Sequence, residues 1–127
     1  MSIPALIITH GRLAEAMLHA TGHFADISDA FRVYSNHHDD IETIVREGVK
    51  FLNESGDGSA FVFTDLVGGS CWQAGLRIRR EFPGARVIGG VNLPMLISFA
   101  VNRNRLETDA LLEKITEDAH KAIRVLS

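Results

Sequence analysis

The stretch IPALIITHG, residues 3–11, decides the fold of this chain. Five of its first six residues are apolar, which is typical of a strand buried on both faces of a parallel sheet. The run ends at Thr9, His10 and Gly11, and a segment with helical spacing follows from Leu13. Open α/β sheets place their functional residues at the carboxyl ends of such strands. The stretch therefore predicts an α/β fold and makes His10 the first candidate functional residue.

Composition predicts one folded domain over residues 1–127. Apolar residues make up 46% of the chain, and a net charge of −3 gives no indication of a nucleic-acid partner. Because Cys71 is the single cysteine, no internal disulfide can form, which favours a reducing compartment. No apolar run approaches the roughly 18 residues that span a bilayer, and no export signal is visible. We therefore expect a cytoplasmic domain.

Strand and helix patterns alternate along the chain. Besides the strand in the opening stretch, apolar runs predict strands at residues 30–34, 60–64 and 86–91. Helical spacing predicts helices at 12–21, from 41 onward, at 71–81, from 94 through 99 and from 108 onward. This order predicts an open, mainly parallel sheet with helices on both faces and right-handed crossovers. Residues 122–126 fit either an extension of the last helix or a final strand.

Capping residues predict where three of the helices begin. Asp39 with Glu42 has the form of a capping box, and so has Ser70 with Gln73. Thr108 is expected to cap the last helix.

Two polar side chains follow the first and third predicted strands, at the same edge of the sheet. His10 ends the first strand and Asp65 follows the third. An imidazole with a pKa near its ordinary value of about 6.5 is largely neutral at cytoplasmic pH, so one ring nitrogen can attack phosphorus. A carboxylate that accepts the other ring N–H fixes the tautomer and stabilises the charged ring. We therefore predict that His10 carries a phosphoryl group and that Asp65 orients it.

The phosphoryl group needs hydrogen-bond donors at the same edge. Gly68, Gly69 and Ser70 open the third helix, where free backbone N–H groups bind anions. Thr9, beside the histidine, is a further candidate phosphate ligand. The two loop histidines at 37–38 have no further matched ligands, so we expect no metal and no cofactor.

Three stretches of the sequence resemble a known family. They are IITHG at residues 7–11, DLVGGS at 65–70 and GVNLPML at 90–96. Together they resemble the IIA component of the mannose-family, phosphoenolpyruvate-dependent sugar phosphotransferase system. The resemblance covers nearly the whole chain, and the third stretch is its most specific part.

This resemblance implies a phosphotransferase with a phosphohistidine intermediate. His10 would accept a phosphoryl group from the histidine phosphocarrier protein and pass it to a IIB component on a separate polypeptide, for sugar uptake. Contact with the membrane would be indirect, through the permease. Asp65 corresponds to the aspartate that orients the active histidine in this family. The resemblance also implies a homodimer in which a C-terminal strand at residues 122–126 pairs antiparallel with the partner's sheet.

Three other interpretations remain open at this point. The phosphoryl-donor subunit of dihydroxyacetone kinase resembles this family in fold and in its strand-end histidine. A regulatory module of the same fold would carry no phosphate on His10. A histidine phosphatase would have arginine before the histidine, where this chain has Thr9.

Overall fold

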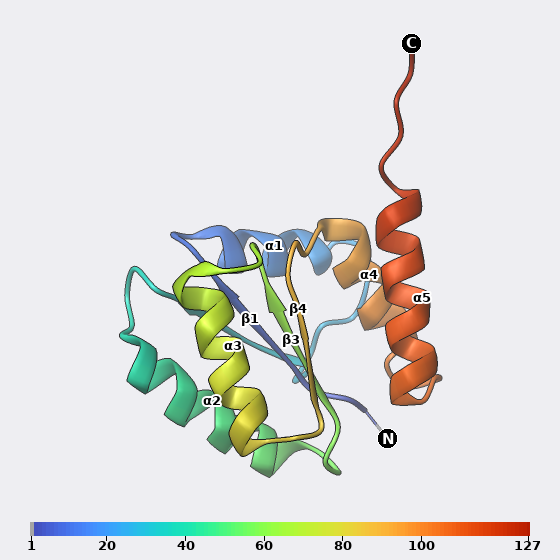
Figure 1. The fold of residues 1–127 in the computed structure, drawn as a ribbon. Helices are drawn as coiled ribbons and strands as arrows, with labels where there is room; N and C mark the ends of the chain where they lie inside the picture. Colours follow the sequence, from blue (N-terminus) through green and yellow to red (C-terminus); the bar gives the residue numbers. More distant parts are fainter. Residues whose placement is uncertain (1) are drawn as a thin grey trace.

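The computed structural model describes residues 2–127, which contain four strands and five helices (Figure 1). The strands are β1 (Ala5–Thr9), β2 (Phe31–Ser35), β3 (Ala60–Thr64) and β4 (Ala85–Ile88). The helices are α1 (Leu13–Thr21), α2 (Ile41–Ser55), α3 (Gly69–Glu81), α4 (Leu93–Asn102) and α5 (Thr108–Lys121). The predicted alternation of strands and helices is confirmed.

The four strands form one parallel sheet in the order β2-β1-β3-β4. The chain runs from β1 to one neighbour, β2, and then crosses to β3 on the other side of β1. The order therefore reverses between β1 and β3, and the carboxyl ends of these two strands flank the switch point at which α/β sheets bind ligands. The register places Ile8 beside Thr64, so the residues that follow these two leave the sheet side by side.

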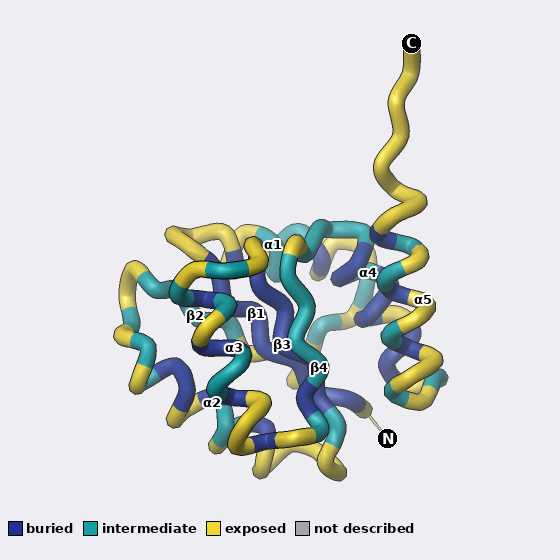
Figure 2. The backbone as a smooth tube through the Cα atoms, viewed as in Figure 1, coloured by how far each residue is buried: buried dark blue, intermediate teal, exposed yellow. Residues whose placement is uncertain are grey.

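Helices cover both faces of the sheet, as predicted. Alternate residues of each central strand serve opposite faces, because successive side chains in a strand point to opposite sides. Ala5 and Ile7 of β1 pack in the layer with α1, α4 and α5, whereas Leu6 and Ile8 pack in the layer with α2 and α3. All five residues of β1 and of β3 are buried, and Figure 2 shows these strands as the buried centre of the molecule.

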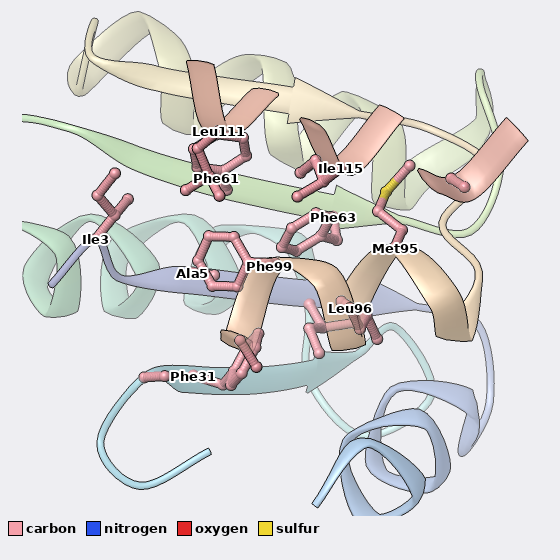
Figure 3. Close-up of a cluster of buried hydrophobic side chains, with 14 of the residues drawn as sticks. Ile3, Ala5, Phe31, Phe61, Phe63, Met95, Leu96, Phe99, Leu111 and Ile115 are labelled. Atoms are coloured by element: carbon pink, nitrogen blue, oxygen red, sulfur yellow. The ribbon is translucent and has the colours of Figure 1, made fainter. Parts of the chain in front are cut away.

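The core on the α4 and α5 side is built around aromatic rings. Phe99 of α4 packs against Phe31 of β2 and against Phe61 and Phe63 of β3, with ring centroids 5.3–5.5 Å apart (Figure 3). Rings at these separations and with tilted or edge-on planes interact favourably beyond the area that they bury. This cluster fixes α4 against the sheet and so holds the loop after β4 in place.

Helix starts differ from the sequence prediction at three positions. Asp40 rather than Asp39 caps α2, since its carboxylate accepts a hydrogen bond from the Thr43 N–H at 2.8 Å. The predicted cap of α5 is also wrong, because Thr108 lies inside the helix and Glu107 precedes it without a side-chain cap. Ser70 does not cap α3, which begins two residues earlier than predicted, at Gly69, with Gly68 in the cap position.

Strand boundaries shift by a few residues. β2 begins one residue later than predicted, at Phe31, and β4 ends at Ile88 rather than at residue 91. β4 stops there because the chain turns through Gly89 and Gly90, and Gly90 has a positive φ of 78°. Beyond the turn, Asn92 caps α4 by accepting a hydrogen bond from the Met95 N–H at 3.0 Å.

The last residues leave the body of the protein beyond α5 (Figure 1). Residues 123–127 are neither helical nor paired as a strand within this chain. Their apolar side chains are exposed: Ile123 by 73%, Val125 by 91% and Leu126 by 100%. The helix extension is therefore excluded beyond residue 122, and pairing of this segment with a second copy of the chain stays a prediction.

Candidate functional site

His10 and Asp65 meet at the switch point of the sheet. His10 follows β1 and Asp65 follows the neighbouring β3. The Asp65 Oδ2 atom lies 2.9 Å from the His10 ring Nδ1 and accepts a second hydrogen bond from the His10 backbone N–H at 3.1 Å. The imidazole is 44% exposed and the carboxylate only 12%. The structure thus brings together the two residues predicted to form the reactive pair, with the histidine toward solvent.

The contact with Asp65 defines the protonation of the imidazole. An ionised carboxylate can only accept hydrogen bonds, so the neutral ring carries its proton on Nδ1 and has a lone pair on Nε2. Burial by itself raises the pKa of Asp65, but the hydrogen bonds from the His10 ring and backbone outweigh it and bring this pKa below its ordinary value. Asp65 is therefore ionised at neutral pH, and Nε2 of His10 is the ring nitrogen whose lone pair is free of this contact.

The amino end of α3 lies beside the imidazole. Gly68 and Gly69 have positive φ angles of 89° and 80°, which only glycine adopts readily, and they bring the chain from Asp65 into the helix. The Sγ atom of Cys71, in the first turn, is 3.8 Å from His10 Nδ1. The first backbone N–H groups of a helix have no partner within the helix and favour negative charge. The arrangement can therefore bind an anion close to His10.

Ser70 and Thr9 are both engaged in hydrogen bonds with the protein. The Ser70 hydroxyl accepts a hydrogen bond from Asn36 Nδ2 at 3.1 Å, which ties the loop after β2 to α3. Thr9 is fully buried, and its hydroxyl accepts a hydrogen bond from the Ala14 N–H at 2.7 Å. The Thr9 hydroxyl thus lies at the start of α1, and its role as a phosphate ligand stays a prediction.

Two residues at this edge are missed by the sequence reasoning. Cys71 is fully buried, and its thiol contacts the imidazole. Burial, and after it the charge of Asp65, raises the pKa of the Cys71 thiol. Asn36 comes from the loop after β2, the strand on the other side of β1. Its place directly after a predicted strand was the available signal.

Comparison with known protein families shows which family this chain belongs to. A family model described as the fructose IIA component of the phosphotransferase system matches residues 5–116. The chain therefore belongs to the mannose- and fructose-type IIA family of the sugar phosphotransferase system, which confirms the resemblance seen in the sequence. No curated protein sequence matches this chain.

Solved structures of similar shape agree with that family. The mannose/sorbose-specific IIA subunit from Enterococcus faecalis is 26% identical, with a TM-score of 0.80 over 100% of this chain and 96% of that one. A phosphotransferase system EIIA component from Streptococcus agalactiae has a TM-score of 0.85 at 20% identity, covering 97% of this chain and 96% of that one. A IIA protein associated with the fucose utilization operon of Streptococcus pneumoniae has a TM-score of 0.80 at 21% identity, covering 98% and 93%.

Family and fold together support a role as a phosphoryl carrier of the phosphotransferase system. They do not favour the dihydroxyacetone kinase subunit. Among residues 2–127, no helix is long and apolar enough to cross a membrane.

Proposed function

We propose that this protein carries a phosphoryl group on Nε2 of His10, taken from the histidine phosphocarrier protein and given to a IIB component for sugar uptake. The observation that carries the proposal is the 2.9 Å contact between His10 Nδ1 and Asp65 on a ring that is 44% exposed. This contact leaves the other ring nitrogen with its lone pair, and the exposure allows a second protein to reach it.

The transfer is an exchange of one P–N bond for another. The Nε2 lone pair attacks the phosphorus held by the donor's histidine, a P–N bond forms on His10, and the donor's ring nitrogen leaves with the electron pair of the broken bond. The His10 ring then carries both the phosphoryl group and the Nδ1 proton, so it is positively charged. Asp65 stabilises that charge through the hydrogen bond that it already makes. Transfer to the IIB component reverses these steps.

The start of α3 supplies donors for the phosphoryl oxygens. A phosphoryl group brings about two negative charges, and free N–H groups at a helix start stabilise such charge. The glycines at 68 and 69 have no atoms within 4 Å of where a Cβ would lie, so the backbone is open to an approaching group. We assign phosphate binding to Gly68, Gly69 and the Ser70 backbone, with the Ser70 hydroxyl held by Asn36.

We further propose that two copies of the chain form a dimer through their C-terminal segments. Residues 123–127 extend beyond α5, and their three large apolar side chains are exposed by 73–100%. Burying such side chains against a second chain is favourable by roughly 25 cal/mol per Å². An antiparallel strand at residues 122–126 on the partner's sheet would bury them. The carrier and its protein partners are expected to meet in the cytoplasm.

Phosphorylation in a reconstituted system tests the proposal. The protein is incubated with radiolabelled phosphoenolpyruvate, enzyme I and the histidine phosphocarrier protein, and acid-labile label is counted per chain. We expect one phosphate per chain, none without the phosphocarrier, and none in His10→Gln. His120→Gln is the matched control, because His120 is exposed at the end of α5. Label retained in His10→Gln, or its absence from the wild type, would refute the proposal.

A further inference from the structure

Three different metal-ligating side chains meet at the switch point. His10, Asp65 and Cys71 each offer one ligand atom, and these three atoms all lie within 4.8 Å of one another. The His10 Nδ1 atom is 2.9 Å from Asp65 Oδ2 and 3.8 Å from Cys71 Sγ. Tetrahedral Zn²⁺ with ligand distances of about 2.0 Å to nitrogen and oxygen and about 2.3 Å to sulfur places its ligands roughly 3.3–3.5 Å apart. The two separations from His10 Nδ1 are within about half an ångström of that spacing, and a turn of the exposed His10 ring together with a movement of about 1 Å between the Asp65 and Cys71 ligand atoms would complete it.

We propose that His10, Asp65 and Cys71 bind a thiophilic divalent ion, Zn²⁺, and that the bound ion blocks phosphorylation of His10. The second part rests on the function proposed above, whereas the binding itself does not. The Cys71 thiol takes no part in the phosphotransfer mechanism. The metal site gives a reason for its position, 3.8 Å from Nδ1 of the reactive ring.

The ligand types favour Zn²⁺ over hard cations. Magnesium and calcium take oxygen ligands, whereas a thiolate, an imidazole and a carboxylate together suit zinc. The thiolate and the carboxylate balance the two positive charges of the ion, so the occupied site is neutral. Such a balance matters here because Cys71 is fully buried and Asp65 nearly so.

The carboxylate of Asp65 has coordinating capacity that the protein does not use. Its Oδ1 atom is buried and has no hydrogen-bond partner among residues 2–127. An unpartnered buried oxygen costs free energy, which a ligand can recover. Meanwhile Oδ2 accepts the backbone N–H of His10, an interaction that can persist when the ring turns from the carboxylate to an ion.

The exposed imidazole provides the path to the site. His10 is 44% exposed whereas Cys71 is buried, so an ion reaches the thiol past the ring. Three protein ligands leave the fourth position of a tetrahedral ion to water, as in zinc sites that are not purely structural. We therefore expect a reversible site rather than one that the fold needs.

A metal ion on Nδ1 changes which nitrogen of His10 holds the proton. The ion takes the Nδ1 lone pair, the ring keeps its single proton on Nε2, and the Cys71 thiol releases its proton to solvent. Nε2 then has no lone pair with which to attack phosphorus. Binding and phosphorylation of His10 are therefore mutually exclusive, even though the phosphoryl group and the ion use different ring nitrogens.

Cobalt spectroscopy tests the binding without any phosphotransfer. Co²⁺ replaces Zn²⁺ in such sites, and a Co²⁺–thiolate bond gives a charge-transfer band that can arise only from Cys71, the single cysteine. We expect this band in the wild type and in the control His120→Gln, its loss in Cys71→Ser, and affinity at least about tenfold weaker in His10→Gln. Zn²⁺ should displace Co²⁺ and abolish the band. Circular dichroism checks that each variant is folded.

Two results would overturn the site. One is the absence of a thiolate band from folded wild-type protein with excess Co²⁺. The other is a band of equal affinity in wild type and His10→Gln, since the ion would then bind Cys71 without the histidine.

The phosphorylation assay tests the consequence separately. Each protein is labelled once with chelator and once with excess Zn²⁺, and the ratio of the two rates is compared after enzyme I and the phosphocarrier are shown to keep their activity in Zn²⁺. We expect a ratio well above one for the wild type and near one for Cys71→Ser. Equal ratios in the two proteins would refute the blocking role. If no label enters with chelator, the proposed function fails, while the cobalt result still decides the metal site.

Discussion

Replacing Asp65 with asparagine is expected to slow phosphorylation of His10 while leaving the fold intact. The substitution keeps the shape of the side chain and removes the charge that faces the ring at 2.9 Å. That charge matters only once the ring has become positive, which happens as the P–N bond forms. The loss should therefore appear in the transfer rate.

The size of the effect follows from the contact distance and the exposure. Two unit charges 2.9 Å apart attract by about 1.4 kcal/mol in bulk water and by about 6 kcal/mol at an effective dielectric constant of about 20. Solvent screens part of this, because the ring is 44% exposed, although the carboxylate is only 12% exposed. A charge-assisted hydrogen bond of about 1.5–3 kcal/mol lies within these limits and corresponds to a rate about 10- to 150-fold lower.

The assay is the initial rate of label incorporation with the phosphocarrier limiting. Asp109→Asn is a matched control, since its carboxylate pairs with Arg86 at 2.9 Å on an exposed surface, and it should transfer at the wild-type rate. Thermal unfolding followed by circular dichroism verifies that both variants are folded. A rate for Asp65→Asn within about twofold of the wild type would refute the role of this carboxylate, because it corresponds to less than about 0.4 kcal/mol.

Four further outcomes follow from the structure. Gly69→Ala should cost about 1–2 kcal/mol of unfolding free energy in denaturant titration, because its φ of 80° is unfavourable for alanine; an unchanged value would contradict the strained turn into α3. Phe99→Ala should cost about 3–5 kcal/mol in the same titration, since it empties the centre of the aromatic cluster. Folding lowers the pKa of Asp65, so the contribution of the ionised carboxylate to the free energy of unfolding is complete above the ordinary carboxyl pKa of about 4 and is lost as the pH falls through the folded value. The difference in unfolding free energy between wild type and Asp65→Asn should therefore shrink between pH 6 and pH 3. A constant difference would contradict this. Deletion of residues 122–127 should convert the dimer to monomer in sedimentation, and an unaltered dimer would contradict strand exchange.

The sequence predicted the sheet because buried parallel strands are nearly continuous apolar runs. β1 and β3 could be recognised in the sequence for this reason. The polar residues that follow them, His10 and Asp65, were expected at the same edge of the sheet. Helix starts were less certain, since Asp39 and Asp40 are neighbours with the same side chain and only the backbone geometry selects Asp40. The capping pattern at Ser70 failed because Gly68 and Gly69 let α3 begin earlier.

The environment of the imidazole could not be read from the sequence. Cys71 is 61 residues from His10, and the two meet only because α3 starts at the end of β3, next to β1. Spacing rules for metal ligands apply within one helix or loop and say nothing about contacts of this kind. Thr9 is a similar case: its place beside His10 indicated a phosphate ligand, but nothing in the sequence indicated that its buried hydroxyl accepts a hydrogen bond from the Ala14 N–H of α1.

Phosphorus NMR of the phosphorylated protein tests the central claim most directly, since it distinguishes a phosphoryl group on Nε2 of a histidine from one on Nδ1. The hydrogen bond from His10 Nδ1 to Asp65 requires a single phosphoramidate signal from Nε2, absent in His10→Gln. A signal from an Nδ1-linked phosphoryl group would show that the carboxylate does not hold that nitrogen's proton, and the account of this site would be wrong.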